Sequence, residues 1–371
     1  MSPTVSIIIP TYNRAQFIGQ TIDSVLAQTF TDYEIIVVDD ASTDDTAQVL
    51  AGYGDRIRVI TLETNTGPSL TRNTALQEAR GELIAFLDSD DLWYPIMLAT
   101  TVAHLKKNPA TDMVGAAWDV IDESGQPIRP ANKPSNFQPA VQADFLRAIA
   151  VGNFLLPLSL LIRRKCFDCC GGFDPTLRAS VDWDLFVRLA AHNHKLDLID
   201  VPVARYRRHR ASITGDPQRM EQASRQLLEK LFSNEALAPR LAGLKEYAYM
   251  KMYLAVAKFC HEAGLETERR NFVQMAERLY PKAPKNKELN LRLLSALFLL
   301  PETEHFRRIV ITSVPEQVLF YYWRRGKQLL RDKQFKIMYE RLKLRNVLSL
   351  ALGVRDAFWR RLRRQKEVEQ K

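Results

Sequence analysis

The sequence LIAFLDSDD, residues 83–91, decides the fold of the N-terminal half of this chain. Five apolar residues lead directly into three carboxylates, at Asp88, Asp90 and Asp91. So short an apolar run is typical of a strand that is covered on both faces of a parallel sheet. Burying unpaired carboxylates is costly, so we expect these acids just beyond the strand, in an opening that faces solvent.

The spacing of Asp88 and Asp90 suits a cation site. Residues i and i+2 of an extended segment project to the same side, so the two carboxylates can converge on one ion. Mg²⁺ and Mn²⁺ are held in this way, with phosphate oxygens and water completing the shell. The alternative is a solvated acidic turn that caps the next helix.

Three further apolar runs precede this strand, and segments with helical spacing separate them. Strands are predicted at residues 5–9, 33–38 and 57–62, and helices at 15–28, 42–50 and 68–79, the second opened by a capping box of Ser42 and Asp45. This alternation predicts a parallel, doubly wound sheet, in which ligands bind beyond the carboxyl ends of the strands. Thr11, Asp39, Asp40 and the acids after Leu87 all follow strands, so we expect them at one edge of the sheet.

The pattern changes along the remaining chain. Strands are predicted at residues 113–118, 158–162 and 201–206, a hairpin turn at 122–125, and helices at 96–107, 145–151, 164–170 and 182–191. Three prolines predict a binding loop or lid at residues 129–139. After residue 215 we expect only helices, at 217–237, 241–264, 266–280, 286–300, 316–331 and 335–364. The predicted domains are residues 1–215, 216–304 and 305–371.

The composition indicates a cytoplasmic location. No run of about 18 apolar residues is present, and the chain begins almost directly with a strand, so neither a membrane-spanning helix nor a signal peptide is predicted. Cys166, Cys169 and Cys170 form a C-x-x-C-C cluster. A zinc site would need partners with matching spacing and only Cys260 remains, so we expect buried, reduced thiols on a helix.

The basic character lies in the C-terminal tail. Residues 305–371 hold 18 Lys and Arg against 6 Asp and Glu, a net charge of +12 in a chain whose total is +9. Aromatic residues interleave with these cations, which suits peripheral attachment to an anionic membrane surface. The alternative is a helical bundle with a solvated basic face. No nucleic-acid-binding module is present to support binding to nucleic acid.

Five segments together resemble glycosyltransferase family 2. They are VSIIIPTYNR (5–14), IIVVDDASTDD (35–45), GPSLTRN (67–73), IAFLDSDD (84–91) and GGFDPTLRASVDWDLFVRL (171–189). The resemblance covers about residues 3–214 and implies a GT-A fold, a Rossmann-like and mostly parallel sheet, followed here by an all-helical region. It also implies an inverting transferase that uses a nucleotide-diphosphate sugar, with Mn²⁺ or Mg²⁺ as cofactor.

The resemblance assigns roles to single residues. Those implied to bind the nucleotide sugar are Pro10, Thr11, Tyr12, Asp40, Arg72, Asp88, Ser89 and His209. Asp40 would accept a hydrogen bond from uracil or thymine, which makes a UDP- or dTDP-sugar the expected donor. Asp88 and Asp90 would bind the metal, and Asp182 would be the catalytic base. Many members of the family carry Glu where this chain has Val181.

Each assignment has a structural alternative. Asp182 could cap the following helix, Asp184 is a second candidate for the base, and His209 could be purely structural. The expected acceptor is a saccharide or a lipid-linked sugar in the synthesis of cell-surface polysaccharide, lipopolysaccharide or another glycoconjugate. A catalytically inactive homologue is the alternative function. A dinucleotide-dependent oxidoreductase would need G-x-G-x-x-G after the first strand, where this chain has PTYNR.

Overall fold

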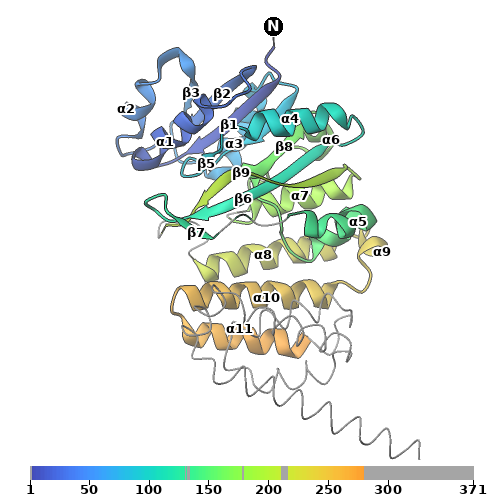
Figure 1. The fold of residues 1–371 in the computed structure, drawn as a ribbon. Helices are drawn as coiled ribbons and strands as arrows, with labels where there is room; N and C mark the ends of the chain where they lie inside the picture. The colour runs from blue at the N-terminus through green and yellow to red at the C-terminus, as the bar shows by residue number, and fades with distance from the viewer. Residues whose placement is uncertain (1, 130, 132–133, 178, 210–215, 280–371) are drawn as a thin grey trace, which may run out of the picture. The chain divides into compact units, whose positions relative to one another are not determined.

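The computed structural model describes residues 2–279 apart from 130, 132–133, 178 and 210–215 (Figure 1). These residues belong to one compact unit, Met1–Ala283. The helices predicted at 286–300, 316–331 and 335–364 lie outside the described residues. The domain borders predicted at residues 215 and 304 stay predictions.

Strands and helices alternate through the first half of the chain, as predicted. The strands are β1 Val5–Thr11, β2 Tyr33–Asp39, β3 Arg58–Thr61, β4 Leu83–Phe86, β5 Leu92–Trp93, β6 Met113–Ile121, β7 Pro127–Arg129, β8 Leu160–Arg163 and β9 Leu196–Arg207. The helices are α1 Ala15–Leu26, α2 Thr46–Ala51, α3 Pro68–Glu78, α4 Met97–Lys107, α5 Gln138–Ala150, α6 Cys166–Cys170, α7 Val181–Ala191, α8 Pro217–Phe232, α9 Ala238–Leu241, α10 Lys245–Glu262 and α11 Glu266–Leu279. Short 3-10 turns are η1 Gly54–Arg56, η2 Pro134–Phe137 and η3 Pro157–Ser159.

The described strands form one sheet in the order β3-β2-β1-β4-β8-β6-β9-β5, with β7 paired to β6. Strands β1 to β4 are parallel, as the alternation predicts. Beyond β4 the sheet is mixed, because β8 is antiparallel to both β4 and β6. A parallel neighbour needs a crossover of about a dozen residues or more. Only residues 87–91, here called the acid turn, separate β4 from β5, so β5 pairs with β9 instead.

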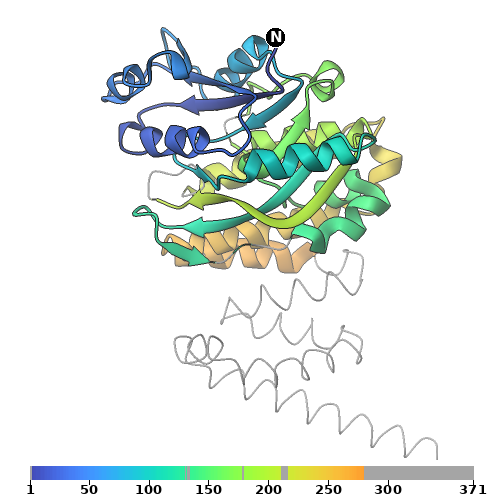
Figure 2. The ribbon, with the colours of Figure 1, turned by 45° about the horizontal axis from the view of Figure 1, so that its top comes forward.

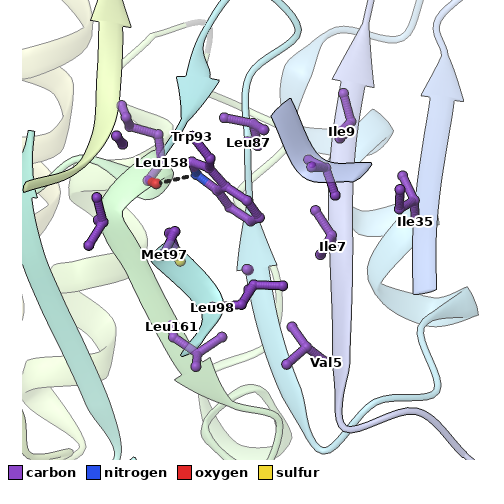
Figure 3. Close-up of a cluster of buried hydrophobic side chains, with 14 of the residues drawn as sticks. Val5, Ile7, Ile9, Ile35, Leu87, Trp93, Met97, Leu98, Leu158 and Leu161 are labelled. Carbon is purple, nitrogen blue, oxygen red and sulfur yellow. Dashed lines mark hydrogen bonds between the residues drawn. The ribbon is translucent and has the colours of Figure 1, made fainter. Parts of the chain in front are cut away.

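Apolar side chains on both faces of the parallel strands hold the sheet and its helices together. On one face, Ile7 and Ile9 pack with α1 and α4, and the indole nitrogen of Trp93 donates a hydrogen bond to the carbonyl of Leu158, 2.7 Å away (Figure 3). On the other face, Phe86 meets the ring of Phe173 edge to face, at 5.0 Å between centroids. Each such buried side chain contributes about 1.5–3 kcal/mol to folding.

The sheet opens at Pro10, where β1 no longer pairs with β4. Residues 8 and 10 of β1 direct their backbone groups toward β4. The Ile8 carbonyl accepts a hydrogen bond from the amide of Leu87. A length of about 2.9–3.0 Å is usual for such a bond. At Pro10 the β4 strand has already ended, so the missing N–H of the proline leaves no ladder bond unmade. β1 therefore runs on to Thr11 beside β2 alone, and the two strands part where Asp88 follows β4.

Several local predictions differ from the structure. The hairpin turn at 122–125 is confirmed, since the Asp122 amide donates to the Gln126 carbonyl at 2.8 Å. The loop predicted at 129–139 is wrong in its described part, because η2 and the start of α5 occupy it. The predicted capping box is also wrong, because the Ser42 hydroxyl donates to Asp39 at 2.5 Å instead and α2 begins only at Thr46.

Helices α8, α10 and α11 lie together on one side of the sheet (Figures 1 and 2). α8 buries Leu227, Leu228 and Leu231, and it is tied to α7 through Lys230, whose ammonium lies 3.1 Å from the Asp184 carboxylate. α10 and α11 pack along each other, with the rings of Tyr253 and Phe272 stacked at 6.1 Å. Within the described residues, no helix combines the length and the apolarity that a bilayer crossing requires.

Candidate active site

A cavity of about 430 Å³ opens beyond the carboxyl ends of β1, β2 and β4, at the edge where the sequence predicts a ligand. Eight of the predicted residues line it: Pro10, Thr11, Tyr12, Asp40, Arg72, Asp88, Ser89 and Asp90. Asp182 and His209 do not line it. Arg14, Tyr206 and Arg219 do, although sequence reasoning gave them no role.

Asp40 shapes one wall of the cavity. Its carboxylate accepts hydrogen bonds from the amides of Thr66 and Gly67, at 2.7 and 2.8 Å, and from the Thr66 hydroxyl at 2.9 Å. These bonds fix the turn that leads into α3, where Gly67 has a φ of +85°. A carboxylate has about four acceptor sites, so Asp40 can still accept a further bond from a ligand.

Arg72 and Asp88, which both line the cavity, form an ion pair. The guanidinium of Arg72, buried on α3, bonds Oδ1 of Asp88 and lies over the ring of Phe173 at 5.3 Å. Its Nε has no hydrogen-bond partner in the described structure, and neither has the buried hydroxyl of Thr11. Buried polar atoms are rarely left unpaired, so these two lining residues fit a polar ligand.

Asp90 is held by two basic side chains from distant parts of the chain. Its Oδ2 lies 2.9 Å from Nε2 of His209 and 3.3 Å from Nε of Arg14. Burial alone would raise the pKa of Asp90, but the hydrogen bond from His209 and the Arg14 charge outweigh it and lower that pKa. Asp90 is therefore a carboxylate at neutral pH, and His209 contacts it from behind the cavity wall, with its ring tilted against that of Phe17 at 5.1 Å between centroids.

Asp91 and Arg207 join the acid turn to the end of β9. The amide of Arg207 donates to Oδ1 of Asp91 at 2.8 Å, and its Nε donates to the Asp90 carbonyl at 2.7 Å. Burial, together with the charges of Asp90 and Asp88, raises the pKa of Asp91 well above its ordinary value. The sequence alone does not reveal this junction. Its only signals are a third Asp after β4 and a basic pair at the end of β9.

Asp182 lies near the cavity without lining it. It is the second residue of α7, behind the left-handed Ser180, and its Oδ2 accepts a hydrogen bond from Nδ2 of Asn153 at 3.0 Å. Burial raises its pKa, against the lowering effect of the Trp183 amide and the Arg72 charge. Asp182 caps no helix, because Ser180 occupies the N-cap position.

Asp184 has the surroundings of a residue that stabilises the fold. Its carboxylate lies 2.7 Å from Nε of Arg188 and 3.1 Å from the ammonium of Lys230, and its side chain is 5% exposed. Both oxygens are thus engaged by cations inside the fold. This geometry favours Asp182 over Asp184 as the candidate base.

The acid pair fits a divalent cation that a ligand shares. Asp88 uses Oδ1 for Arg72 and Asp90 uses Oδ2 for its two partners, so one oxygen of each carboxylate is left for an ion. Among the described residues the pair belongs to no cluster of three metal-binding side chains. Mg²⁺ needs no such cluster when phosphate oxygens and water complete its octahedron.

Comparison with known proteins shows what part of the chain is similar to. The sequence model of glycosyl transferase family 2 matches residues 6–172. A protein of Rickettsia felis described as an uncharacterized glycosyltransferase is 35% identical over 190 residues, 50% of this chain and 31% of that protein. The Escherichia coli enzyme WfgD, a UDP-Glc:alpha-D-GlcNAc-diphosphoundecaprenol beta-1,3-glucosyltransferase, is 43% identical over 121 residues, 32% of this chain and 47% of that enzyme. The chain thus spans less than half the length of either relative.

A solved structure extends the likeness to the fold. The mannosyltransferase PcManGT from Pyrobaculum calidifontis, in complex with GDP-Man and Mn²⁺, is 21% identical, covers 84% of both chains and superposes with a TM-score of 0.53. At this identity the likeness concerns the fold alone, and it agrees with the mixed sheet and the flanking helices described above. Residues 6–172 therefore carry a domain of glycosyltransferase family 2, a family of transferase enzymes, and the N-terminal part of the chain has the GT-A fold.

Proposed function

We propose that this chain moves a sugar from a nucleotide-diphosphate sugar to an acceptor hydroxyl, with inversion at the anomeric carbon. The observation that carries the proposal is the cavity, where Asp40, Arg72 and the Asp88–Asp90 pair meet at one edge of the sheet. All the acids that the reaction needs are present, which argues against the inactive homologue.

The donor would extend through the cavity from Asp40 to the acid turn. Tyr12, 43% exposed beside Pro10, offers a ring for the base, and Asp40 offers an acceptor for the imide N–H of uracil or thymine. Arg14, Arg72, Arg207 and Arg219 give the lining a positive charge that suits a diphosphate. The donor named for WfgD is also a UDP-sugar, which supports the same choice here.

Asp88 and Asp90 would hold Mn²⁺ or Mg²⁺ together with the diphosphate. When bound, such an ion supplies a Lewis acid that neutralises the charge of the departing nucleoside diphosphate. In the described structure the guanidinium groups of Arg72 and Arg14 neutralise the two carboxylates. We infer that these cations turn toward the phosphates when the donor and the metal enter.

Asp182 would take the proton of the acceptor hydroxyl as it attacks the sugar. A general base works best when its pKa approaches the working pH, and burial raises the pKa of Asp182 in that direction. Asn153 orients the carboxylate by donating to Oδ2. A single displacement from the face opposite the diphosphate inverts the anomeric centre.

The acceptor that we propose is a lipid-linked saccharide, in the synthesis of a cell-surface polysaccharide or glycoconjugate. The name of WfgD states such an acceptor for that enzyme. The net charge of +12 in residues 305–371 would bring the chain to an anionic membrane, where lipid-linked acceptors reside.

A thermal-shift panel tests the donor site. UDP-, dTDP- and GDP-sugars are added to the full chain with and without Mn²⁺, and we expect a rise in Tm with a UDP- or dTDP-sugar that requires the metal. Asp90→Ala should abolish this metal-dependent rise. Asp45→Ala, which removes an exposed carboxylate with no capping bond, should keep it. No shift with any donor in the wild type would contradict the proposal.

A further inference from the structure

Three side chains with soft metal-ligating atoms meet at α6. Sγ of Cys169 lies 3.2 Å from Nε2 of His194 and 3.6 Å from Sγ of Cys170. His194 belongs to the turn between α7 and β9, 25 residues from Cys169 in the sequence. The sequence shows only the cysteines, because nothing in their spacing points to this histidine.

The cluster is separate from the donor cavity. β8 ends at Arg163 opposite Leu83, the first residue of β4, and α6 follows directly. β9 begins at Leu196, just after His194 and opposite the first residue of β6. The cluster therefore lies where β4 starts, whereas the donor cavity lies beyond the point where β4 ends.

The two distances from Sγ of Cys169 match a zinc site, and all three ligand atoms lie within 4.8 Å of one another. Zn²⁺ binds thiolate sulfur at about 2.3 Å and imidazole nitrogen at about 2.0–2.1 Å in tetrahedral geometry, so two sulfurs lie about 3.8 Å apart and sulfur and nitrogen about 3.5 Å apart. The observed separations, 3.6 and 3.2 Å, are each within a few tenths of an ångström of these values.

The surroundings of His194 support the same conclusion. Its other ring nitrogen, Nδ1, lies 3.4 Å from Oδ2 of Asp112. A zinc-binding histidine usually donates its second N–H to a carboxylate, which fixes its tautomer and orientation. Asp112 is itself held in place by the ammonium of Lys165 at 2.8 Å and the amide of Lys195 at 3.0 Å.

A second set of three atoms, from Asp112, Cys166 and His194, is equally compact. It fits an ion less well, because Lys165 and Lys195 already bond the Asp112 carboxylate. Cys166 is fully buried on the inner side of α6, while Cys169 is exposed. The exposed side offers an ion a path from solvent.

We propose that Cys169, Cys170 and His194 bind a zinc ion, with water in the fourth position and Asp112 orienting the histidine. The ion would join α6 to the turn before β9 and so stabilise the edge of the sheet away from the donor cavity. A coordinated thiol loses its proton to solvent as the metal binds. No electron transfer takes place.

A disulfide fits the cysteines less well. It needs sulfurs about 2.05 Å apart, and adjacent residues satisfy its geometry only with backbone movement.

Metal content and Co²⁺ spectra of the full chain test the proposal. After incubation with zinc and exhaustive dialysis, we expect one zinc per chain by elemental analysis. Co²⁺ in place of zinc should give thiolate-to-metal charge-transfer absorption in the near ultraviolet. Cys169→Ser, Cys170→Ser and His194→Gln should each weaken Co²⁺ binding by at least tenfold, whereas Cys260→Ser, which removes a buried thiol on α10, should leave it unchanged.

Three results would overturn the proposal. One is a wild-type chain that retains no zinc and gives no charge-transfer band. Another is Co²⁺ binding that survives in all three cluster variants. The third is the loss of two titratable thiols without metal, which would show a Cys169–Cys170 disulfide. The wild-type spectrum needs no variant, so the test holds even where a substitution prevents folding.

Discussion

The carboxylates of this site differ in how readily they gain a proton, because their neighbours differ. Asp182, Asp184 and Asp90 all lie at or near the donor region, yet cations hold Asp184 and Asp90 while an amide holds Asp182. Neighbouring cations keep a carboxylate ionised and occupy its oxygens in ion pairs. An amide donor with partial burial leaves it able to gain a proton.

Asp182→Asn tests the base. We expect turnover to fall by about 10²–10⁴-fold, which is the range for loss of a general base, with donor affinity unchanged. The measurement is release of nucleoside diphosphate at saturating donor and acceptor. Asp184→Asn is the matched comparison. It breaks a buried ion cluster, so it should lower the free energy of unfolding by about 3 kcal/mol. If instead Asp184→Asn abolishes turnover in folded protein and Asp182→Asn does not, the two roles are exchanged.

Asn153→Ala tests the positioning of that base. The amide of Asn153 donates to the charged form of Asp182, so its removal should raise the already raised pKa further. Because the base must be deprotonated, turnover falls as pH drops through this pKa. The acid limb of the pH–rate profile should therefore move to higher pH in the variant. A loss of turnover that is equal at every pH would point to a merely structural Asn153.

At the scale of elements, close contact between β1 and β4 fixes the acid turn. Gly81 precedes β4, and a Cβ at this position would lie 2.5 Å from the backbone nitrogen of Ser6. Backbone atoms in a paired strand cannot retreat as a flexible side chain can. The glycine thus lets the two strands lie side by side with their carboxyl ends at one cavity.

Gly81→Ala should destabilise the fold by about 1–3 kcal/mol, the usual cost of overpacking a well-packed interior. Chemical denaturation measures this free energy. Gly19→Ala is the control, because its Cβ would meet nothing nearer than the Tyr53 hydroxyl, at 3.4 Å, and a helix interior prefers alanine by about 0.5–1 kcal/mol. Equal stability of the two variants would show that the Gly81 contact is not tight.

The sequence predicted those elements whose signal is local. β1, β2 and β4 were evident as apolar runs, and the acids after them share one edge because parallel strands end together. β5 has two residues and β7 three, too few for any periodic pattern. The start of β9 was missed because its residues alternate between buried and partly exposed positions rather than forming an apolar run.

Side-chain partners far apart in the sequence could not be predicted. The contact of Arg14 with Asp90 joins residues 76 apart, and that of Arg207 with the Asp90 carbonyl joins residues 117 apart. Such pairs depend on strand order, and β9 lies several strands away from β4 in the sheet. The resemblance to the family supplied the lining residues, whereas only the structure shows which cations hold the acids.

At the scale of the whole molecule, the charge distribution predicts membrane association. The full chain should sediment with vesicles that contain anionic lipids at low salt and be released at high salt, because surface charges are screened. Replacing Arg360, Arg361, Arg363 and Arg364 by Ala should weaken binding by about two to three orders of magnitude, since each cation contributes about 1 kcal/mol and about 1.4 kcal/mol is tenfold. Replacing Lys106 and Lys107, exposed at the end of α4, should not. If the full chain does not sediment with these vesicles at low salt, the prediction of membrane association is wrong.

The wall formed by Tyr206, Arg207 and Arg219 has a consequence for dissecting this enzyme. The family match stops at residue 172, and the predicted border at residue 215 runs between Arg207 and Arg219. A fragment cut at either point would keep Asp40 and the acid turn but expose them to water on one flank. The first helix after the sheet thus contributes to the wall of the cavity, and truncated versions should be designed to end beyond α8.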